Sequence, residues 1–177
     1  MALIQHKRRL NPTVTLMEVS APLIAKKAQP GQFIILRVDE HGERIPLTIS
    51  DYDRERGAVT IIFEKVGVTT ELLDRLEEGD DILDFVGPLG TPTDLLDREH
   101  PGLELGPVKR VAVIGGGVGC AIALPIAKEL HDQGCVVHSV VGFRNKDLLI
   151  LEDEFKACSD ELRIMTDDGS YGTKGVV

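Results

Sequence analysis

The sequence is poor in aromatic residues and in cysteine. It contains no tryptophan among its 177 residues, and aromatic side chains account for only 4% of them. The three cysteines, Cys120, Cys135 and Cys158, are too few and too scattered for a disulfide framework. Free thiols are the normal state in a reducing compartment, so this usage predicts a cytoplasmic protein.

Long apolar runs and targeting signals are also missing. No apolar run approaches the roughly 18 residues that a membrane-spanning helix requires. Residues 1–10, MALIQHKRRL, carry basic side chains but lack the apolar stretch that follows them in a signal peptide. We therefore expect no membrane span and no signal peptide.

Basic side chains are outnumbered, because 20 Lys and Arg against 29 Asp and Glu give a net charge of −9. An acidic surface repels phosphate backbones, so nucleic-acid binding is not expected. Hydrophobic residues make up 42% of the chain, which predicts a globular protein with a core rather than a disordered one. No metal site is predicted within this chain, because metal-ligand spacing is absent among His6, His41, His100, His131 and His138.

Proline is unevenly distributed, with eight of the nine prolines before residue 108. Proline disfavours long helices, and this region instead contains short β-like runs separated by turn residues. The pattern predicts an antiparallel β barrel or sandwich. One helix is predicted at 71–78, with Thr70 as its N-cap and Gly79 just past its end. The predicted strands are 13–19, 32–38, 45–50, 59–66 and 81–86.

The remainder of the chain alternates apolar and helical segments, which indicates an α/β domain with a doubly wound parallel sheet. Three strands are few for such a sheet, since about 4–6 are usual. We therefore expect this domain to be truncated at its C-terminus or completed by another chain. The predicted domains are 1–100 and 108–177, joined by a linker at 101–107. The predicted elements of the second are strand 111–114, helix 118–133, strand 135–141, helix 148–157 and strand 162–165.

A glycine-rich turn joins the first strand and helix of this second domain. Its residues are Gly115, Gly116, Gly117, Val118 and Gly119. A pyrophosphate needs close backbone N–H groups, which a Cβ would obstruct, and a helix N-terminus adds partial positive charge. The spacing is not G-x-G-x-x-G, so a tight turn without a ligand is the alternative reading.

Charged residues follow the other two predicted strands of the domain. Arg144 would accept the 2′-phosphate of NADP, or it is an ordinary surface charge. Asp167, Asp168 and Gly169 would receive ribose hydroxyls, or they form a plain turn. The choice between NAD and NADP is left open by these residues.

In the first domain, Arg44, Pro46 and Thr48 lie on alternate positions of one predicted strand, so they share a face. An arginine there suits a diphosphate, and a threonine hydroxyl suits the polar edge of a heterocycle. A surface strand that happens to carry one arginine is the alternative interpretation.

Several strings together resemble the ferredoxin–NADP reductase superfamily of flavoproteins. The resemblance is greatest to its electron-transfer subunits, such as the alpha subunit of NADH-dependent ferredoxin–NADP reductase, the beta subunit of sulfide dehydrogenase and the dihydroorotate dehydrogenase electron-transfer subunit. It implies an antiparallel FAD-binding β barrel followed by an NAD(P)-binding α/β domain. The strings, in chain order, are RIPLTI (44–49), VGVTT (66–70), GPLG (87–90), GGGVG (115–119), GFRNKDLL (142–149) and TDDGSYG (166–172).

The resemblance also implies roles for single residues. Thr48 takes the catalytic position near the reactive N5 of the flavin, Leu47 replaces the usual aromatic residue, and Arg44 faces the diphosphate. The other implied FAD contacts are Pro46, Ile49, Gly67, Thr69, Thr70, Gly87, Pro88, Leu89 and Gly90. The implied NAD(P) contacts are Gly115, Gly116, Gly117, Val118, Gly119, Cys120, Arg144, Asp167, Asp168 and Gly169.

The function implied is that of an oxidoreductase subunit that passes electrons between NAD(P)H and an iron–sulfur partner through FAD. A larger catalytic flavoprotein or iron–sulfur subunit is the expected partner, and a ferredoxin-like acceptor is a further option. The branch carries a [2Fe-2S] cluster on closely spaced cysteines, which we expect only in a missing C-terminal segment. The alternatives are the dihydroorotate dehydrogenase electron-transfer subunit, a stand-alone NAD(P)H:flavin or ferredoxin oxidoreductase, and a non-catalytic nucleotide-binding module.

Overall fold

The computed structural model describes residues 1–93 and 109–177. The chain divides into two compact units, Met1–Thr91 and Pro92–Val177. The predicted domain boundary at residue 100 and the predicted linker at 101–107 lie outside the described residues. The two units are considered separately below.

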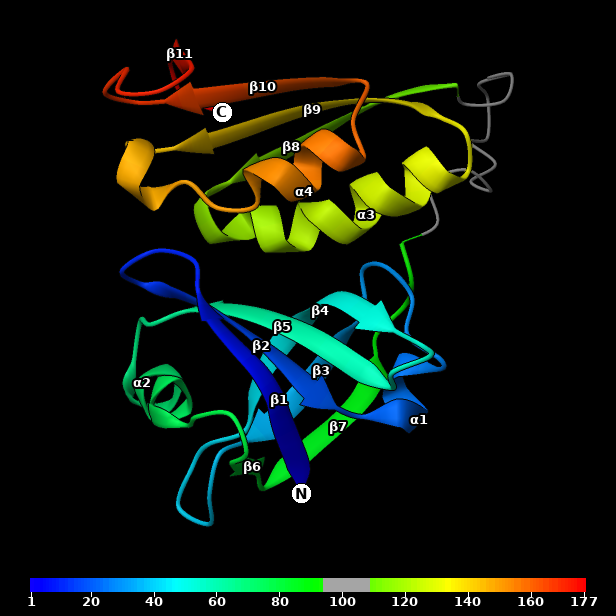
Figure 1. Cartoon of the computed structure of the whole chain (residues 1–177), viewed down its shortest axis with the longest axis vertical. Coiled ribbons are helices and arrows are strands. Elements are labelled where there is room, and N and C mark those ends of the chain that lie inside the picture. Colours follow the sequence, from blue (N-terminus) through cyan, green and yellow to red (C-terminus); the bar gives the residue numbers. More distant parts are fainter. Residues whose placement is uncertain (94–108) are drawn as a thin grey trace. The chain divides into compact units, whose positions relative to one another are not determined.

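The first unit is an antiparallel β barrel, as the sequence predicts, and it carries two short helices where the sequence predicts one (Figure 1). Its strands follow the order β6-β1-β2-β5-β4-β3-β7. The elements are β1 (Ala2–Arg9), β2 (Val14–Ser20), α1 (Pro22–Ala25), β3 (Phe33–Arg37), β4 (Ile45–Asp53), β5 (Ala58–Glu64), α2 (Val68–Arg75), β6 (Asp81–Ile82) and β7 (Asp84–Leu89).

The barrel interior is filled by alternate residues of each strand. Branched aliphatic side chains dominate it, and each contributes roughly 1.5–3 kcal/mol when fully buried. The period of two is clear in β3, where Ile34 and Leu36 are buried and their strand neighbours are half-buried. The other fully buried members include Ile4, Met17, Val19, Ile49, Val59, Ile61, Leu73 and Ile82.

The helix after β5 differs from its prediction. It spans Val68–Arg75 rather than 71–78, and Gly67 is its N-cap in place of Thr70. Thr70 instead lies inside the first turn, where its side chain bonds back to the backbone of Gly67. The helix ends early because Leu76 takes an extended conformation (ψ 143°), and Lys7 donates to the carbonyl oxygens of Asp74 and Leu76.

The second unit contains a parallel sheet in the order β11-β10-β9-β8. Each successive strand is added on the same side of the previous one, from β8 to β9 to β10. Because crossovers between parallel strands are right-handed, α3 and α4 both cover the same face of this sheet (Figure 1). Among the described residues, β8 pairs with β9 alone, and Ile114 on it is 64% exposed. The elements are β8 (Arg110–Gly116), the 3₁₀ turn η1 (Gly117–Gly119), α3 (Cys120–Asp132), β9 (Val136–Phe143), η2 (Lys146–Leu148), α4 (Glu152–Ala157), β10 (Glu161–Thr166) and β11 (Thr173–Lys174).

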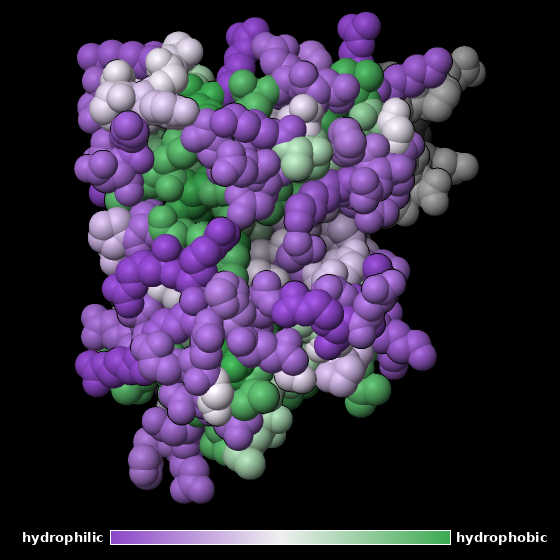
Figure 2. Space-filling view, viewed as in Figure 1, coloured by the Kyte–Doolittle hydropathy of each residue, from purple (hydrophilic) through white to green (hydrophobic). Residues whose placement is uncertain are grey.

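The surface in Figure 2 is mainly hydrophilic, with apolar patches on each unit. In the part of the chain that the structure describes, no helix is long and apolar enough to cross a membrane.

Candidate functional site

Strand β4 changes neighbours halfway along its length. From Ile45 to Thr48 it pairs with β3, and from Ile49 to Asp53 it pairs with β5. A β-bulge marks the change, because Ile49 and Asp51 face consecutive residues of β5. In the described ladders, the first half of β4 therefore has one edge without a strand partner. Free backbone groups at such an edge are available to a ligand.

Phe33 of β3 brings two of the predicted flavin motifs together. It pairs with Thr48 of β4 on one side and with Leu89 of β7 on the other. Paired residues share a face of the sheet, so the three half-buried side chains form one row. A Cβ on Gly90 would lie 2.8 Å from the Phe33 ring, so glycine is required there for packing.

The sequence analysis missed Phe33, although one signal was present. Phe33 is one of only five phenylalanines, and it follows the Pro30–Gly31 turn at the start of a strand. Leu47 replaces the aromatic residue that the resemblance leads one to expect. An aromatic side chain next to Thr48 is thus supplied by the neighbouring strand instead.

Gln32 joins the end of β7 to β4. Its carbonyl oxygen accepts from the Ile49 amide at 3.0 Å, and its Nε2 donates to the Gly90 carbonyl at 2.9 Å. Gly87 also has a packing role, since a Cβ there would lie 2.7 Å from Cγ2 of Ile34. The structure therefore holds the GPLG segment on the far side of β3 from Thr48, with Gly87 and Gly90 packed closely against β3.

The N-terminus of α2 offers open space and free donors. Gly67 is extended (φ −171°), and no atom lies within 4 Å of where its Cβ would stand. Thr70 orders this turn, because its hydroxyl accepts from the amides of Val66 and Gly67 and donates to the Gly67 carbonyl. The first amides of a helix and its dipole favour an anionic group. An exposed Val66 and an exposed Val68 flank this position.

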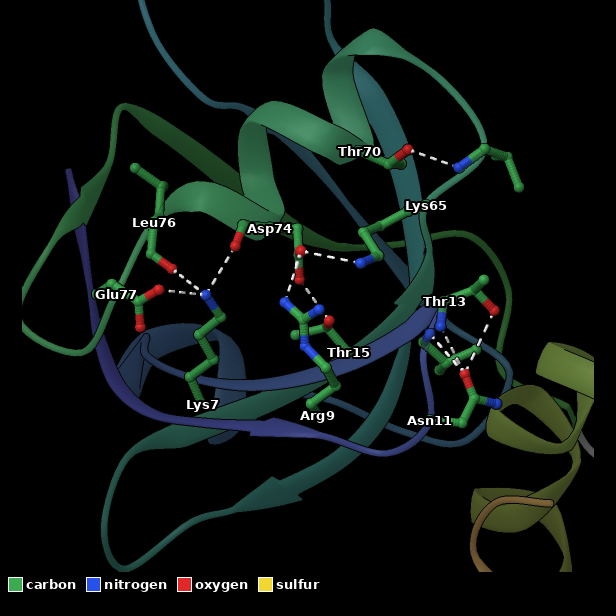
Figure 3. Close-up of polar contacts among 12 residues, drawn as sticks. Lys7, Arg9, Asn11, Thr13, Thr15, Lys65, Thr70, Asp74, Leu76 and Glu77 are labelled. Atoms are coloured by element: carbon green, nitrogen blue, oxygen red, sulfur yellow. Dashed lines mark hydrogen bonds and ion pairs between the residues drawn. The ribbon is translucent and has the colours of Figure 1, made fainter. Parts of the chain in front are cut away.

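A cluster of charges fastens the other end of α2 to the barrel (Figure 3). Asp74 accepts from the Thr15 hydroxyl at 2.5 Å and pairs with Arg9 at 2.9 Å and Lys65 at 3.3 Å. Burial works to raise the pKa of Asp74, but the hydrogen bonds from Thr15 and Lys65 and the charge of Arg9 outweigh it and lower the pKa. The cluster fixes the direction in which the helix N-terminus points.

Arg44 lies at the start of β4 and is paired with a carboxylate. Its Nη2 is 3.0 Å from Oδ2 of Asp84, the same oxygen that accepts from Nε of Arg37 at 2.8 Å. The Arg44 side chain is 61% exposed. Asp84 therefore orients the guanidinium while leaving most of its donors available to solvent or to a phosphate.

The glycine bend of the second unit joins β8 to α3. Gly115 is tightly packed, because a Cβ there would stand 3.1 Å from Sγ of Cys120. Gly117 has a left-handed conformation (φ +52°), and open space surrounds both Gly117 and Gly119. The strand continues to Gly116 and the α-helix begins at Cys120, two residues later than predicted. Three glycines at the end of a strand thus leave room for a ligand beside the first amides of a helix.

The second unit contains all three cysteines of the chain. All three are buried and free. Burial raises the pKa of the Cys120 thiol to about 12, so it stays protonated. Its side chain faces Gly115 inside the unit, so only the backbone of Cys120 is available to a ligand. In residues 1–93 and 109–177, no group of three or more His, Cys, Asp and Glu side chains could hold a metal ion.

The predicted charged residues of this unit meet at one sheet edge. The Asp167 amide donates to the Phe143 carbonyl at 3.1 Å, and the Asp168 amide donates to the Arg144 carbonyl at 3.3 Å. Parallel pairing puts Gly116, Gly142 and Met165 in register, so the glycine bend lies at the same edge.

Two further contacts shape this edge. Hydrogen bonds from Ser170 lower the pKa of Asp168 and use part of its carboxylate. The Val177 side chain lies against Gly142 and Gly116, since a Cβ on these glycines would meet its methyl groups at 2.4 Å and 3.4 Å. Gly169 adopts a left-handed φ of +78° beside Lys174, so it is the turn that closes the loop to β11.

Comparison with known proteins identifies relatives of the whole chain. It is 46% identical over 172 residues to an uncharacterized protein in the adh 3′ region of Clostridium beijerinckii, covering 97% of this chain and 57% of that protein. It is 47% identical over 159 residues to a homologue of the dihydroorotate dehydrogenase B (NAD(+)) electron transfer subunit of Thermotoga maritima, covering 90% and 52%. No family model matches the chain. The chain thus spans just over half the length of these relatives.

Comparison with solved structures identifies proteins of similar fold. The chain matches the NADH-dependent reduced ferredoxin-NADP oxidoreductase with a TM-score of 0.87 and 41% identity, covering 99% of this chain and 59% of that one. Phthalate dioxygenase reductase matches with a TM-score of 0.72 at 20% identity, covering 95% and 51%, and shows likeness of fold alone. These structures share the barrel and the α/β unit described above.

Proposed function

Because the chain belongs to the ferredoxin–NADP reductase superfamily, we propose that it is the FAD- and NAD(P)H-binding part of an electron-transfer subunit in a larger oxidoreductase. One observation carries the proposal. Motifs far apart in the sequence meet at two places that we take as candidate openings: Thr48 and Leu89 flank Phe33 beside the free edge of β4, and the glycine bend after β8 leaves space at Gly117 and Gly119.

The first opening suits FAD. The open space at Gly67 and the first amides of α2 receive the diphosphate, and Arg44 supplies a second positive group. The Thr48 hydroxyl faces the flavin ring, and the row formed with Phe33 and Leu89 provides apolar contact. Pro46, Leu47, Ile49, Thr69, Thr70, Pro88 and Gly90 complete the wall.

The second opening suits NAD(P)H. Gly117 and Gly119 leave space for the pyrophosphate beside the start of α3, with Gly116 and Val118 completing the bend. Arg144, Asp167 and Asp168 stand at the same sheet edge, where ribose hydroxyls or a 2′-phosphate would lie. The exposed arginine favours NADPH and the two aspartates favour NADH.

When bound, the two coenzymes supply the redox chemistry, which is hydride exchange between nicotinamide and flavin followed by delivery of single electrons. The chain's own residues bind, orient and shield them. Thr48 donates a hydrogen bond at the flavin ring, and the glycines of both openings admit the phosphates by lacking side chains.

The iron–sulfur acceptor belongs outside the described residues. No cysteine set among them suits a cluster, and Cys120, Cys135 and Cys158 are buried as small apolar side chains. A [2Fe-2S]-bearing segment or subunit, together with a larger catalytic partner, completes the electron path. The cytoplasm is the fitting compartment, since all three thiols are free.

Titration of the purified chain with FAD tests the proposal. Binding should quench flavin fluorescence, and NADH or NADPH should bleach the bound flavin's visible absorption in the absence of oxygen. Titration with FMN is the matched control, because it lacks the adenylate that the two-phosphate site recognises. A chain that does not bind FAD would contradict the proposal, and one that still binds a pyridine nucleotide would favour the non-catalytic nucleotide-binding module.

A second experiment distinguishes the partners. The relatives named above point to a dihydroorotate dehydrogenase catalytic subunit and to a ferredoxin reductase partner. Size-exclusion chromatography with each candidate large subunit, followed by NADH-dependent reduction of that subunit, identifies the partner. A chain that stays monomeric with both, yet reduces ferredoxin alone, would instead be a stand-alone reductase.

A further inference from the structure

The loop that follows β10 is closed at its base by a buried threonine. Thr166 is the last residue of β10 and is fully buried. Its hydroxyl donates to the Tyr171 carbonyl oxygen at 2.7 Å and accepts from the Tyr171 amide at 3.2 Å. Residues 167–170 therefore form a compact loop, which we call the acid loop. It carries Asp167 and Asp168, the two aspartates that stand where ribose hydroxyls would lie in the proposed function.

One side of the acid loop is fastened to the segment after β9. Two of its amides donate to carbonyl groups of that segment, as described above. A third link comes from Ser170, whose hydroxyl accepts from the Lys146 amide at 2.8 Å. The Ser170 amide in turn donates to Oδ1 of Asp168 at 2.9 Å. This side of the loop is held largely through main-chain groups, which do not depend on the identity of the side chains.

A side-chain contact ties the end of the acid loop to α4. The Tyr171 hydroxyl donates to Oε1 of Glu152, the first residue of α4, at 2.8 Å. Lys156, one turn further along the helix, lies 2.7 Å from the same oxygen. The hydrogen bond from Lys156 and, in smaller part, the one from Tyr171 lower the pKa of Glu152, so the acceptor is charged at neutral pH. Hydrogen bonds to a charged acceptor are stronger than neutral ones.

We propose that Tyr171 is a positioning residue for the pyridine nucleotide, because its bond to Glu152 holds the acid loop in the conformation that presents Asp167 and Asp168 to a ribose. A loop that is ordered before the ligand arrives loses less conformational freedom on binding, so the affinity is higher. Tyr171 acts through the loop and not by touching the nucleotide. The inference rests on the proposed function, since it needs a pyridine nucleotide at the sheet edge beside the glycine bend.

The variant Tyr171→Phe tests the inference, because it removes the hydroxyl and keeps the ring. Tyr52→Phe is the matched control, since Tyr52 is the only other tyrosine of the chain and lies on β4 in the first unit. The FAD-loaded proteins are used, so that the flavin site is already filled. Their affinity for FAD should be the same as that of the wild type.

Isothermal titration with ADP and with 2′,3′-dideoxy-ADP separates positioning from a general loss of structure. Both probes carry the adenine and two phosphates, but only ADP offers ribose hydroxyls to the acid loop. The wild type should bind ADP more tightly than the dideoxy analogue. Tyr171→Phe should raise the dissociation constant for ADP roughly 3–10-fold, the effect of about one net hydrogen bond, and leave that for the analogue unchanged. Tyr52→Phe should leave both unchanged.

A double variant tests whether the bond to Glu152 is the cause. Tyr171→Phe and Glu152→Ala each remove the same hydrogen bond, so their effects should not add. The double variant should bind ADP no more weakly than Tyr171→Phe alone. Additive losses would show that Tyr171 does not act through Glu152 and would overturn the inference.

The other failures are distinguishable. A wild type that takes up no FAD, or that binds neither NADH nor NADPH once loaded, contradicts the proposed function itself. If the wild type binds a coenzyme, lack of a preference for ADP over its dideoxy analogue overturns the inference. Unchanged ADP affinity in Tyr171→Phe overturns it as well, as does an equal weakening of both probes.

Discussion

Arg9 of β1 and Asp74 of α2 form an ion pair of 2.9 Å between residues 65 positions apart in the chain. The pair belongs to the cluster that fastens α2 to the barrel, and only 11% of the Asp74 side chain is exposed. The direction of the helix, and hence of the N-terminus proposed to receive the FAD diphosphate, depends on this contact. Asp74 is therefore the first residue to change.

Asp74→Asn should destabilise the first unit by about 1–3 kcal/mol at pH 7, because Arg9 and Lys65 keep their charges and lose their carboxylate. The folded pKa of Asp74 lies below its ordinary value of 3.8. Its stabilising effect is thus complete above about pH 4 and is lost as the pH falls through the folded pKa. Urea unfolding at pH 7 and pH 3 measures both effects.

The control for this variant is Glu77→Gln. Glu77 contacts Lys7 at 2.8 Å but is 72% exposed, so solvent screens the pair. Glu77→Gln should lower the free energy of unfolding by less than about 0.5 kcal/mol. An Asp74→Asn variant as stable as the wild type at pH 7 would show that the cluster does not hold the helix.

Thr70→Ala should loosen the turn before α2 without unfolding the barrel. Three hydrogen bonds to Val66 and Gly67 are lost, so the amides that face the phosphate are no longer fixed. FAD affinity should fall about tenfold, equivalent to roughly 1.4 kcal/mol. Fluorescence titration measures the change. Thr70→Ser keeps the hydroxyl and should bind FAD as the wild type does; if both variants bind equally weakly, the hydroxyl is not the cause.

Thr48→Ala should slow reduction of the bound flavin by NAD(P)H more than it weakens FAD binding. The row with Phe33 and Leu89 remains, so much of the apolar contact with FAD persists. A loss of at least about tenfold in rate is expected when one hydrogen bond that strengthens in the transition state is removed. Stopped-flow absorbance follows the rate, and Thr48→Ser should restore it. Equal losses in rate and affinity would contradict the role near N5.

Gly117→Val should abolish NAD(P)H binding while FAD binding survives. A side chain fills the open space at the bend, and the left-handed φ of +52° disfavours it as well. Gly134→Val is the control for the second effect, because Gly134 has φ +83° and open surroundings at the far end of α3. Isothermal titration with NADH and NADPH should register binding for the control alone. Retained affinity in Gly117→Val would move the site elsewhere.

The thiols should resist alkylation in the folded chain. All three are buried, and burial raises the pKa of Cys120 to about 12, far above that of a reactive thiolate. Iodoacetamide at pH 8 should modify the native protein slowly and all three cysteines rapidly in urea, as counted by mass spectrometry. Fast native modification of Cys120 would indicate that the glycine bend opens in solution.

The local patterns were enough to predict most of the elements. Short β-like runs bounded by turn residues predicted β2, β3, β4 and β5, because both signals are local. The predicted strand 81–86 is divided between β6 and β7 in the structure. The glycine bend was predicted for a similarly local reason, since glycine suits the tight packing at Gly115 and the φ of Gly117. The sequence analysis did not predict β1 as a strand. Its exposed positions carry charged side chains, and the residues that pair with them, such as Asp74, are remote in the sequence.

The sequence by itself determined the fold class, the two kinds of nucleotide-binding motif and the strand that carries Thr48, because each depends on residues adjacent in the chain. Only the tertiary structure decided that Phe33 lies between Thr48 and Leu89, that α2 begins at Val68, and that Ser50 is buried without a partner. These three features result from strand register, a β-bulge and ion pairs across the barrel. Each of them depends on contacts between residues that are distant in the sequence.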